Sequence, residues 1–262
     1  MSVVPAGWLR PEWPAPGGVR ALVTTRGAGA EAPAAPFGTF NLAAHVGDDP
    51  ARVAANRRRL QQCLGVGRVQ WLQQVHGTEV LRLAGGSGDA EPEPPCADGL
   101  YTRAPGVALA IMTADCLPIL LCDRRGREIA ALHAGWRGLA AGIVAQGVTA
   151  FRAPGAELLA WLGPAIGPDH FEVGGEVRAA FLRDASRGGL GAGAGAAFSP
   201  ARRPDHYFCD LYRLARLALA QCGVEAVYGG GWCTACERER FFSYRAEGRC
   251  GRMTSLIWLG PG

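Results

Sequence analysis

Three residues that lie far apart in the chain, His76, Cys116 and His133, have side chains that bind transition metals. Two imidazoles and one thiolate suit zinc and also copper, and three protein ligands leave a fourth position open for water or substrate. Each of the three stands at the end of an expected strand, beside a glycine or a small residue, where the backbone can approach a ligand closely. This set predicts a catalytic metal site that holds about one ion per chain.

The same residues admit two other interpretations. A free cysteine in an apolar strand is usually a core residue. Alternatively, Cys116 is a nucleophile and His133 is the general base that activates it. The spacing of the three residues does not by itself separate these interpretations from a metal site.

The segment that carries the cysteine, Met112–Leu120, lies between two short apolar runs, Gly106–Ile111 and Ile119–Cys122. Each run predicts a buried strand. Between them, Asp115 is costly to bury unless it is paired, and Pro118 is expected to end the strand ladder or to form a bulge. Asp115 is thus either a proton shuttle or the partner of a ligand histidine, and we favour the partner role.

Arginine supplies all 27 basic residues, and the sequence contains no lysine. Mechanisms that use a Schiff-base lysine or a Walker lysine are therefore excluded. A phosphate or carboxylate group must instead be held by arginine, backbone amides or a metal. Arg26 and Arg245 are the candidates to contact phosphate or ribose, whereas Arg137 follows an expected strand-to-helix turn and can simply pack along the helix.

Two further motifs remain open. Asn41 and His45 flank a turn, so Asn41 is a candidate substrate contact, although a turn or capping role explains it equally well. Cys233 and Cys236 form the only C-x-x-C pair of the sequence, and we expect a structural or incidental role for it.

Composition limits the class of protein. With 48% hydrophobic and 19% charged residues, the 262-residue chain is expected to be globular, and a net charge of +4 gives no reason to expect a nucleic-acid partner. No signal-peptide core and no apolar run long enough for a membrane span are present. Nine cysteines without a secretory signal indicate free thiols in a reducing compartment, so we expect a cytoplasmic monomer with no membrane partner.

Strand-like and helix-like segments mix without strict alternation, which predicts one α/β or α+β domain over residues 1–262, with mixed sheets and flanking helices. Asp49 and Pro50 predict a helix start, and the apolar spacing from Leu139 to Phe151 predicts one helix that begins near Gly135. Gln70–Val75 is expected to be a strand that leads to His76.

Seven motifs together resemble the YfiH family of laccase-domain proteins, and they occur in the order found in that family. They are Phe40–Leu42, His45–Pro50, Gln74–Gly77, Thr113–Pro118, His133–Gly138, Gly163–Gly167 and Phe241–Arg245. The resemblance runs from about Arg20 to the end of the chain. Members of this family are called purine nucleoside phosphorylase, polyphenol oxidase or peptidoglycan editing factor.

The resemblance implies a single α/β domain of the YfiH type, with zinc bound by the residues that match here as His76, Cys116 and His133. It further implies phosphorolysis of adenosine, inosine and methylthioadenosine, and deamination of adenosine, so that a nucleoside and phosphate are the expected small-molecule partners. Editing of a peptidoglycan precursor is the alternative. A copper-dependent polyphenol oxidase is a second alternative, although five histidines are few for several copper ions.

One position departs from the family pattern. Many members place cysteine after the motif that ends here at Gly167-Pro168, whereas this chain has Asp169 and His170. A role for a thiol at that point is therefore in doubt, while the three expected metal ligands are unaffected.

Overall fold

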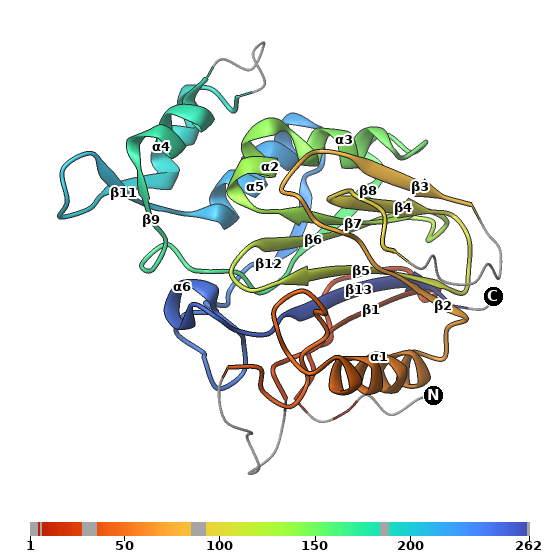
Figure 1. Ribbon diagram of the computed structural model, residues 1–262. Helices are drawn as coiled ribbons and strands as arrows, with labels where there is room; N and C mark the ends of the chain where they lie inside the picture. The colour runs from red at the N-terminus through yellow and green to blue at the C-terminus, as the bar shows by residue number, and fades with distance from the viewer. Residues whose placement is uncertain (1–4, 6, 28–35, 85–92, 184–188, 261–262) are drawn as a thin grey trace.

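The computed structural model describes residues 5, 7–27, 36–84, 93–183 and 189–260, and Figure 1 shows how their elements are arranged. The strands are β1 (Val19–Val23), β2 (Arg68–Gln70), β3 (Val80–Leu83), β4 (Gly99–Thr102), β5 (Val107–Thr113), β6 (Leu117–Asp123), β7 (Ile129–Ala134), β8 (Leu158–Leu162), β9 (Glu172–Gly174), β10 (Phe198–Pro200), β11 (His206–Cys209), β12 (Ala226–Gly229) and β13 (Met253–Leu259). The helices are α1 (Pro50–Leu64), α2 (Trp136–Ala141), α3 (Ile143–Thr149), α4 (Gly175–Leu182), α5 (Leu211–Gln221) and α6 (Tyr244–Glu247), with short 3-10 turns at Gly155–Glu157 and Ala192–Ala197.

Two mixed sheets lie face to face at the centre of the molecule (Figure 1). One has four strands in the order β1-β13-β5-β2, and the other has six in the order β12-β8-β6-β7-β4-β3. Helices α2, α3 and α5 cover the outer face of the six-stranded sheet, and α1 covers the outer face of the four-stranded sheet (Figure 1). This four-layer arrangement confirms the expected α/β class.

The central strands are buried on both faces, which explains their nearly uninterrupted apolar sequences. In β6, Ile119 and Leu121 pack toward the helices, whereas Leu120 contributes to the core between the sheets. In β5, Leu109 faces the same inter-sheet core, and Ala110 packs toward α1. Side chains alternate between the two faces of a strand, so a strand between two layers needs apolar residues at every position.

The two strands on either side of the Asp115–Cys116 segment belong to different sheets, because β5 lies in the four-stranded sheet and β6 in the six-stranded one. The expectation that Pro118 breaks the ladder is wrong. β6 continues through Pro118, which pairs with His133 of β7, and the Pro118 carbonyl accepts a hydrogen bond from Gly163. Proline is tolerated here because it is the second residue of the strand, where the ladder begins.

Helix signals in the sequence are confirmed at one place and revised at another. Asp49 caps α1 by accepting a hydrogen bond from the Ala51 N–H, and Pro50 opens the helix. The single helix expected from Gly135 is instead two helices, α2 and α3, because Gly142 adopts φ 99° between them. That left-handed conformation suits glycine and ends the first helix.

The remaining elements lie at the edges of the two-sheet core. Strands β9, β10 and β11 form a small antiparallel sheet that projects with α4 to one side, and α6 lies near the same end of the molecule (Figure 1). Among the described residues, no helix combines the length and the apolar character that crossing a membrane would need.

Candidate metal centre

Cys116 lies in the three-residue segment that crosses from one sheet to the other, directly after Asp115. Asp115 has φ 90°, a left-handed conformation that is strained for a residue with a side chain. Its carboxylate accepts hydrogen bonds from Thr234 Oγ1 (2.6 Å), Ser243 Oγ (2.7 Å) and the Arg245 N–H (2.6 Å). These bonds hold the strained crossing in place and fix the position from which Cys116 projects.

His133 comes from β7, and its ring is buried. Nδ1 donates a hydrogen bond to Asp98 Oδ1 at 2.7 Å, which leaves Nε2 as the atom available to a metal. The expectation that Asp115 is the partner of a candidate ligand histidine is therefore wrong. Asp98 is the partner of His133, and the Asp115 carboxylate instead accepts the two hydroxyl groups and the amide named above.

His76 is placed by the same aspartate. Asp98 accepts the backbone N–H groups of Val75 (3.2 Å), His76 (2.9 Å) and Gly77 (2.7 Å). These amides are therefore not available to a strand ladder, and the strand expected over Gln70–Val75 ends with β2 at Gln70. His76 itself adopts φ 61°, so a second strained residue occurs at this site.

The donor atoms of His76, Cys116 and His133 all lie within 4.8 Å of one another. Cys116 Sγ is 3.8 Å from His76 Nε2, and the two imidazole rings meet edge to face with centroids 4.8 Å apart. Gly135 borders the cluster so closely that a Cβ there would lie 2.9 Å from His76 Cδ2 and 3.0 Å from Cys116 Sγ. The donor types, their convergence and the space left by this glycine fit a bound metal ion.

Electrostatics couple the Cys116 thiol to the two histidines. Burial would raise the pKa of Cys116, but the charges and hydrogen bonds of His133 and His76 outweigh burial and lower that pKa to about 6. Burial would lower the pKa of His133, but Cys116 and Asp98 raise it to about 9. The thiol is thus disposed to be a thiolate, which is the form that binds a metal and also the form that acts as a nucleophile.

A cavity of about 370 Å³ opens at the cluster. Besides the three candidate ligands, its lining includes His45, Gln74, Met112, Thr113, Ala114, Tyr244 and Arg252. Gln74 is held rigidly because its side-chain amide exchanges two hydrogen bonds with the backbone of Met112. The Tyr244 side chain is 60% exposed, so an aromatic face remains open at the rim.

Three residues predicted to contact substrate do not line this cavity. Arg26 donates to Glu247 Oε1 at 2.7 Å and to the carbonyls of Arg238 and Phe241, so its guanidinium holds the C-terminal segment together. Asn41 is buried in a turn, where it bonds Ala43, Asp48 and the Arg252 N–H.

Arg245 Nη1 donates to the Glu172 carbonyl, and its guanidinium packs over the Phe171 ring. A different arginine, Arg252, lines the cavity. Its Nη1 donates to the carbonyls of Cys250 (2.8 Å) and Gly251 (2.9 Å), and its guanidinium lies 5.8 Å from the centre of the Tyr244 ring.

Sequence reasoning missed Asp98 and Arg252. Asp98 was detectable as an acidic residue directly before the buried strand β4, a position where a carboxylate needs partners. Arg252 had no comparable signal, since nothing local distinguishes it from the other arginines near the end of the chain.

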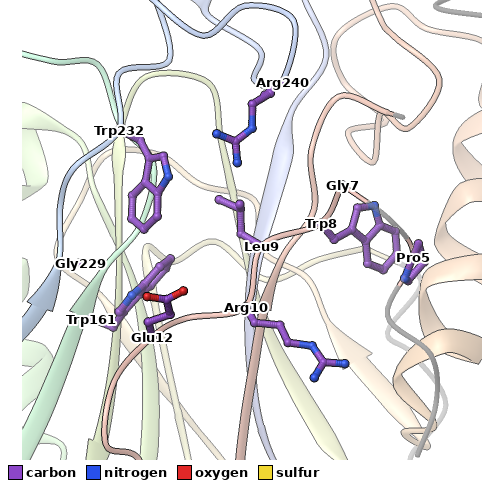
Figure 2. A pocket seen from close by; sticks show the side chains of 10 residues that line it. All are labelled: Pro5, Gly7, Trp8, Leu9, Arg10, Glu12, Trp161, Gly229, Trp232 and Arg240. Atoms are coloured by element: carbon purple, nitrogen blue, oxygen red, sulfur yellow. The ribbon is translucent and has the colours of Figure 1, made fainter. Parts of the chain in front are cut away.

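A larger cavity, of about 980 Å³, lies elsewhere, between the N-terminal segment and the edge of the six-stranded sheet. Figure 2 shows its lining, in which Glu12 lies beside Trp161 and Arg10 points away from both Trp161 and Trp232. None of the three candidate metal ligands lines it, so its size does not make it the reactive site.

Comparison with known proteins relates this site to a family. Residues 20–260 match the model of the family described as "Multi-copper polyphenol oxidoreductase laccase". A purine nucleoside phosphorylase of Pseudomonas aeruginosa is 52% identical over 96% of this chain and 98% of its own length. The purine nucleoside phosphorylase YfiH of Escherichia coli is 49% identical over 95% of this chain and 97% of its own length.

Solved structures agree with this relationship. A crystal structure of a Neisseria meningitidis protein superposes with a TM-score of 0.87 at 44% identity, covering 97% of this chain and 100% of that chain. YlmD from Geobacillus stearothermophilus superposes with a TM-score of 0.82 at 32% identity, covering 97% of each chain. The chain therefore belongs to the YfiH family of laccase-domain proteins.

Proposed function

We propose that this protein is a zinc-dependent purine nucleoside phosphorylase that cleaves adenosine, inosine and methylthioadenosine with phosphate, and that it also deaminates adenosine. The observation that carries the proposal is a single cavity of about 370 Å³ in which a His-Cys-His metal cluster, Arg252 and the Tyr244 ring come together. A cavity of this size suits a small organic ligand. The names of the relatives at 52% and 49% identity support the same activity.

Zinc is the metal that we assign to the cluster, with His76 Nε2, Cys116 Sγ and His133 Nε2 as its ligands. When bound, zinc would act as a Lewis acid that polarises a substrate atom or acidifies a water molecule. A multi-copper oxidase would need several further histidines. Of the other histidines, only His45 lines this cavity, so a polyphenol oxidase is not favoured.

The residues around the metal position would each contact a different part of the substrates. Arg252 provides the guanidinium that phosphate needs in a chain without lysine, and its Nη2 and Nε make no protein hydrogen bond among the described residues. The exposed Tyr244 ring offers a flat apolar face for a purine base. In phosphorolysis, a phosphate oxygen forms the new bond to the ribose C1′ as the bond from C1′ to the purine nitrogen breaks.

The two proposed reactions share the base-binding surface and differ in the second reactant. Phosphorolysis consumes phosphate and releases a free purine, whereas deamination consumes water and releases ammonia. Two alternatives make different predictions. Editing of a peptidoglycan precursor would use the same open cavity with a much larger substrate. If Cys116 is a nucleophile, a covalent intermediate on its sulfur would form during turnover.

Turnover of adenosine by the purified protein, with and without phosphate, tests the proposal. We expect release of free adenine that depends on phosphate, formation of inosine that does not, and loss of both in Cys116→Ala. Cys96→Ser, which changes an exposed cysteine outside the cluster, is the matched control and should retain both activities. Turnover of muropeptide precursors without turnover of nucleosides, or a mass adduct on Cys116 during turnover, would reject the assignment.

Arg252→Lys tests the phosphate site within that proposal. Lysine keeps the charge but cannot form the two-pronged contact of a guanidinium, so we expect the KM for phosphate to rise roughly 10- to 100-fold, from the loss of a charge-assisted hydrogen bond. Deamination should change much less. Arg26→Lys is the control, because the Arg26 guanidinium forms an ion pair with Glu247 outside the cavity. This variant should have lower stability and an unchanged KM for phosphate. An equal loss of both reactions in Arg252→Lys would make Arg252 a structural residue.

A further inference from the structure

A second group of metal-binding side chains lies outside the nucleoside cavity. Sγ of Cys233, Sγ of Cys236 and an imidazole nitrogen of His170 all lie within 4.8 Å of one another. His170 ends the turn that follows Gly167-Pro168, and the two cysteines belong to a tight turn between β12 and α6. The cluster borders a separate cavity of about 490 Å³.

The separations match tetrahedral coordination. His170 Nδ1 is 3.8 Å from Cys233 Sγ and 3.6 Å from Cys236 Sγ. Bond lengths of about 2.3 Å to sulfur and about 2.0–2.1 Å to nitrogen at tetrahedral angles place sulfur and nitrogen about 3.6 Å apart. The three donors are therefore already close to the positions that one zinc ion would require.

Backbone hydrogen bonds also fix the position of the Cys233 sulfur. The Cys233 carbonyl accepts N–H groups from Cys236 (3.1 Å) and Glu237 (3.0 Å), which closes the turn so that both sulfurs face one side. The Gly167 N–H donates to Cys233 Sγ at 3.2 Å. A Cβ at Gly167 would lie 3.1 Å from that sulfur, so a larger residue would crowd the contact. An N–H group directed at a sulfur stabilises its anionic form, which is the form that binds metals.

Acidic side chains stand next to two of the three donors. Asp169 directly precedes His170, and Glu237 directly follows Cys236. Negative charge beside the sulfurs favours a bound cation. Asp169 lines the same cavity beside His170.

We propose that His170, Cys233 and Cys236 bind a second zinc ion with a structural role, distinct from the metal at His76, Cys116 and His133. Thr234, inside the C-x-x-C turn, donates through its hydroxyl to Asp115 Oδ1 at 2.6 Å, and its N–H donates to the Ala165 carbonyl at 3.0 Å. A metal that closes this turn would hold Asp115, and through it the Cys116 crossing, in the strained conformation described above.

Metal analysis of the full-length protein, purified under reducing conditions without chelator, tests this proposal. We expect about two zinc ions per chain in the wild type and about one in either Cys236→Ser or His170→Ala. Cys116→Ala should also hold about one, and Cys116→Ala/Cys236→Ser should hold none. The matched control Cys96→Ser should equal the wild type. A wild type with one ion, lost in Cys116→Ala and retained in Cys236→Ser, would overturn the second site while supporting the first.

Thiol chemistry and melting supply a second readout that does not depend on activity. In Cys116→Ala, the Cys236 thiol should resist alkylation until a chelator is added, and the chelator should lower the Tm. The same chelator should leave the Tm of Cys116→Ala/Cys236→Ser unchanged. If Cys116→Ala fails to fold, His76→Ala takes its place. Alkylation of Cys236 at equal rates with and without chelator, or a Cys233–Cys236 disulfide in the reduced preparation, would reject metal binding.

Discussion

At the scale of single residues, Asp98 determines the geometry of the candidate metal centre. It is fully buried and accepts four hydrogen bonds, one from the His133 ring and three from the backbone at Val75, His76 and Gly77. Burial would raise its pKa, but these bonds outweigh burial and hold the pKa of Asp98 below its ordinary value. One carboxylate therefore sets the tautomer of one ligand and the backbone conformation of another.

Asp98→Asn should weaken zinc binding by about 10- to 100-fold, because an amide cannot accept all these bonds and no longer strengthens His133 as a ligand. Competition with a chromogenic chelator measures the affinity. Asp123→Asn is the matched control, since Asp123 also accepts several backbone N–H groups but lies at the far end of β6. The control should lose stability and keep its zinc affinity; an equal loss of affinity in both variants would contradict a specific role for Asp98.

At the scale of elements, the centre forms where four chain segments meet at the ends of strands. The crossing between β5 and β6 carries Cys116, β7 carries His133, the chain after β2 carries His76, and α2 begins at Trp136 just beyond Gly135. Because the α2 backbone starts directly against the cluster, the residue before it must lack a side chain. The glycine is required here by close approach and not by its backbone angles, since φ is −62°.

Gly135→Ala should therefore reduce zinc occupancy while the fold persists. The added Cβ would lie 2.9–3.0 Å from His76 and Cys116, which forces one of the two ligands to move. Metal content and far-ultraviolet circular dichroism measure the two effects separately. In Gly18→Ala, the control, the new Cβ meets nothing within 4 Å. Full zinc content in Gly135→Ala would show that the ligands have more freedom than this geometry allows.

At the scale of the whole molecule, packing buries two thiols, and burial raises their pKa in the folded protein above the value in the unfolded chain. Burial, assisted by the charge of Asp123, raises the pKa of Cys122 to about 12. Burial and the charge of Asp210 raise the pKa of Cys209 to about 12 in the same way. The ordinary thiol value is 9.0, so between these limits the unfolded chain binds fewer protons than the folded one.

The contribution of these two thiols to stability should therefore be complete below about pH 9 and should be lost as pH rises toward 12, by at most about 1.4 kcal/mol per pH unit for each buried thiol. Lysine adds no titration in this range because the chain has none, whereas Tyr101, whose pKa burial raises to about 12, adds a loss of the same sign in every variant. Urea unfolding at several alkaline pH values measures the slope. Cys122→Ala should make the slope shallower, whereas Cys96→Ser, at an exposed site, should not change it. Equal slopes in all three proteins would contradict this origin of the pH dependence.

The sequence by itself determined the local elements and singled out the candidate metal donors. The Asp49-Pro50 start of α1 and the apolar runs of β5 and β6 depend on neighbouring residues, so they could be predicted from the sequence. His76, Cys116 and His133 could be singled out because few side chain types bind soft metals, and the structure brings their donor atoms within 4.8 Å of one another.

Only the tertiary structure decided which polar residues serve these donors. The chain cannot show locally that β5 and β6 enter different sheets, that Asp98 rather than Asp115 holds His133, or that Arg252 rather than Arg26 lines the cavity. The tertiary structure also brings His170 next to Cys233 and Cys236, a cluster that sequence spacing does not reveal. Partners of a buried polar group are chosen by long-range packing, because desolvation makes any group within reach a better partner than none.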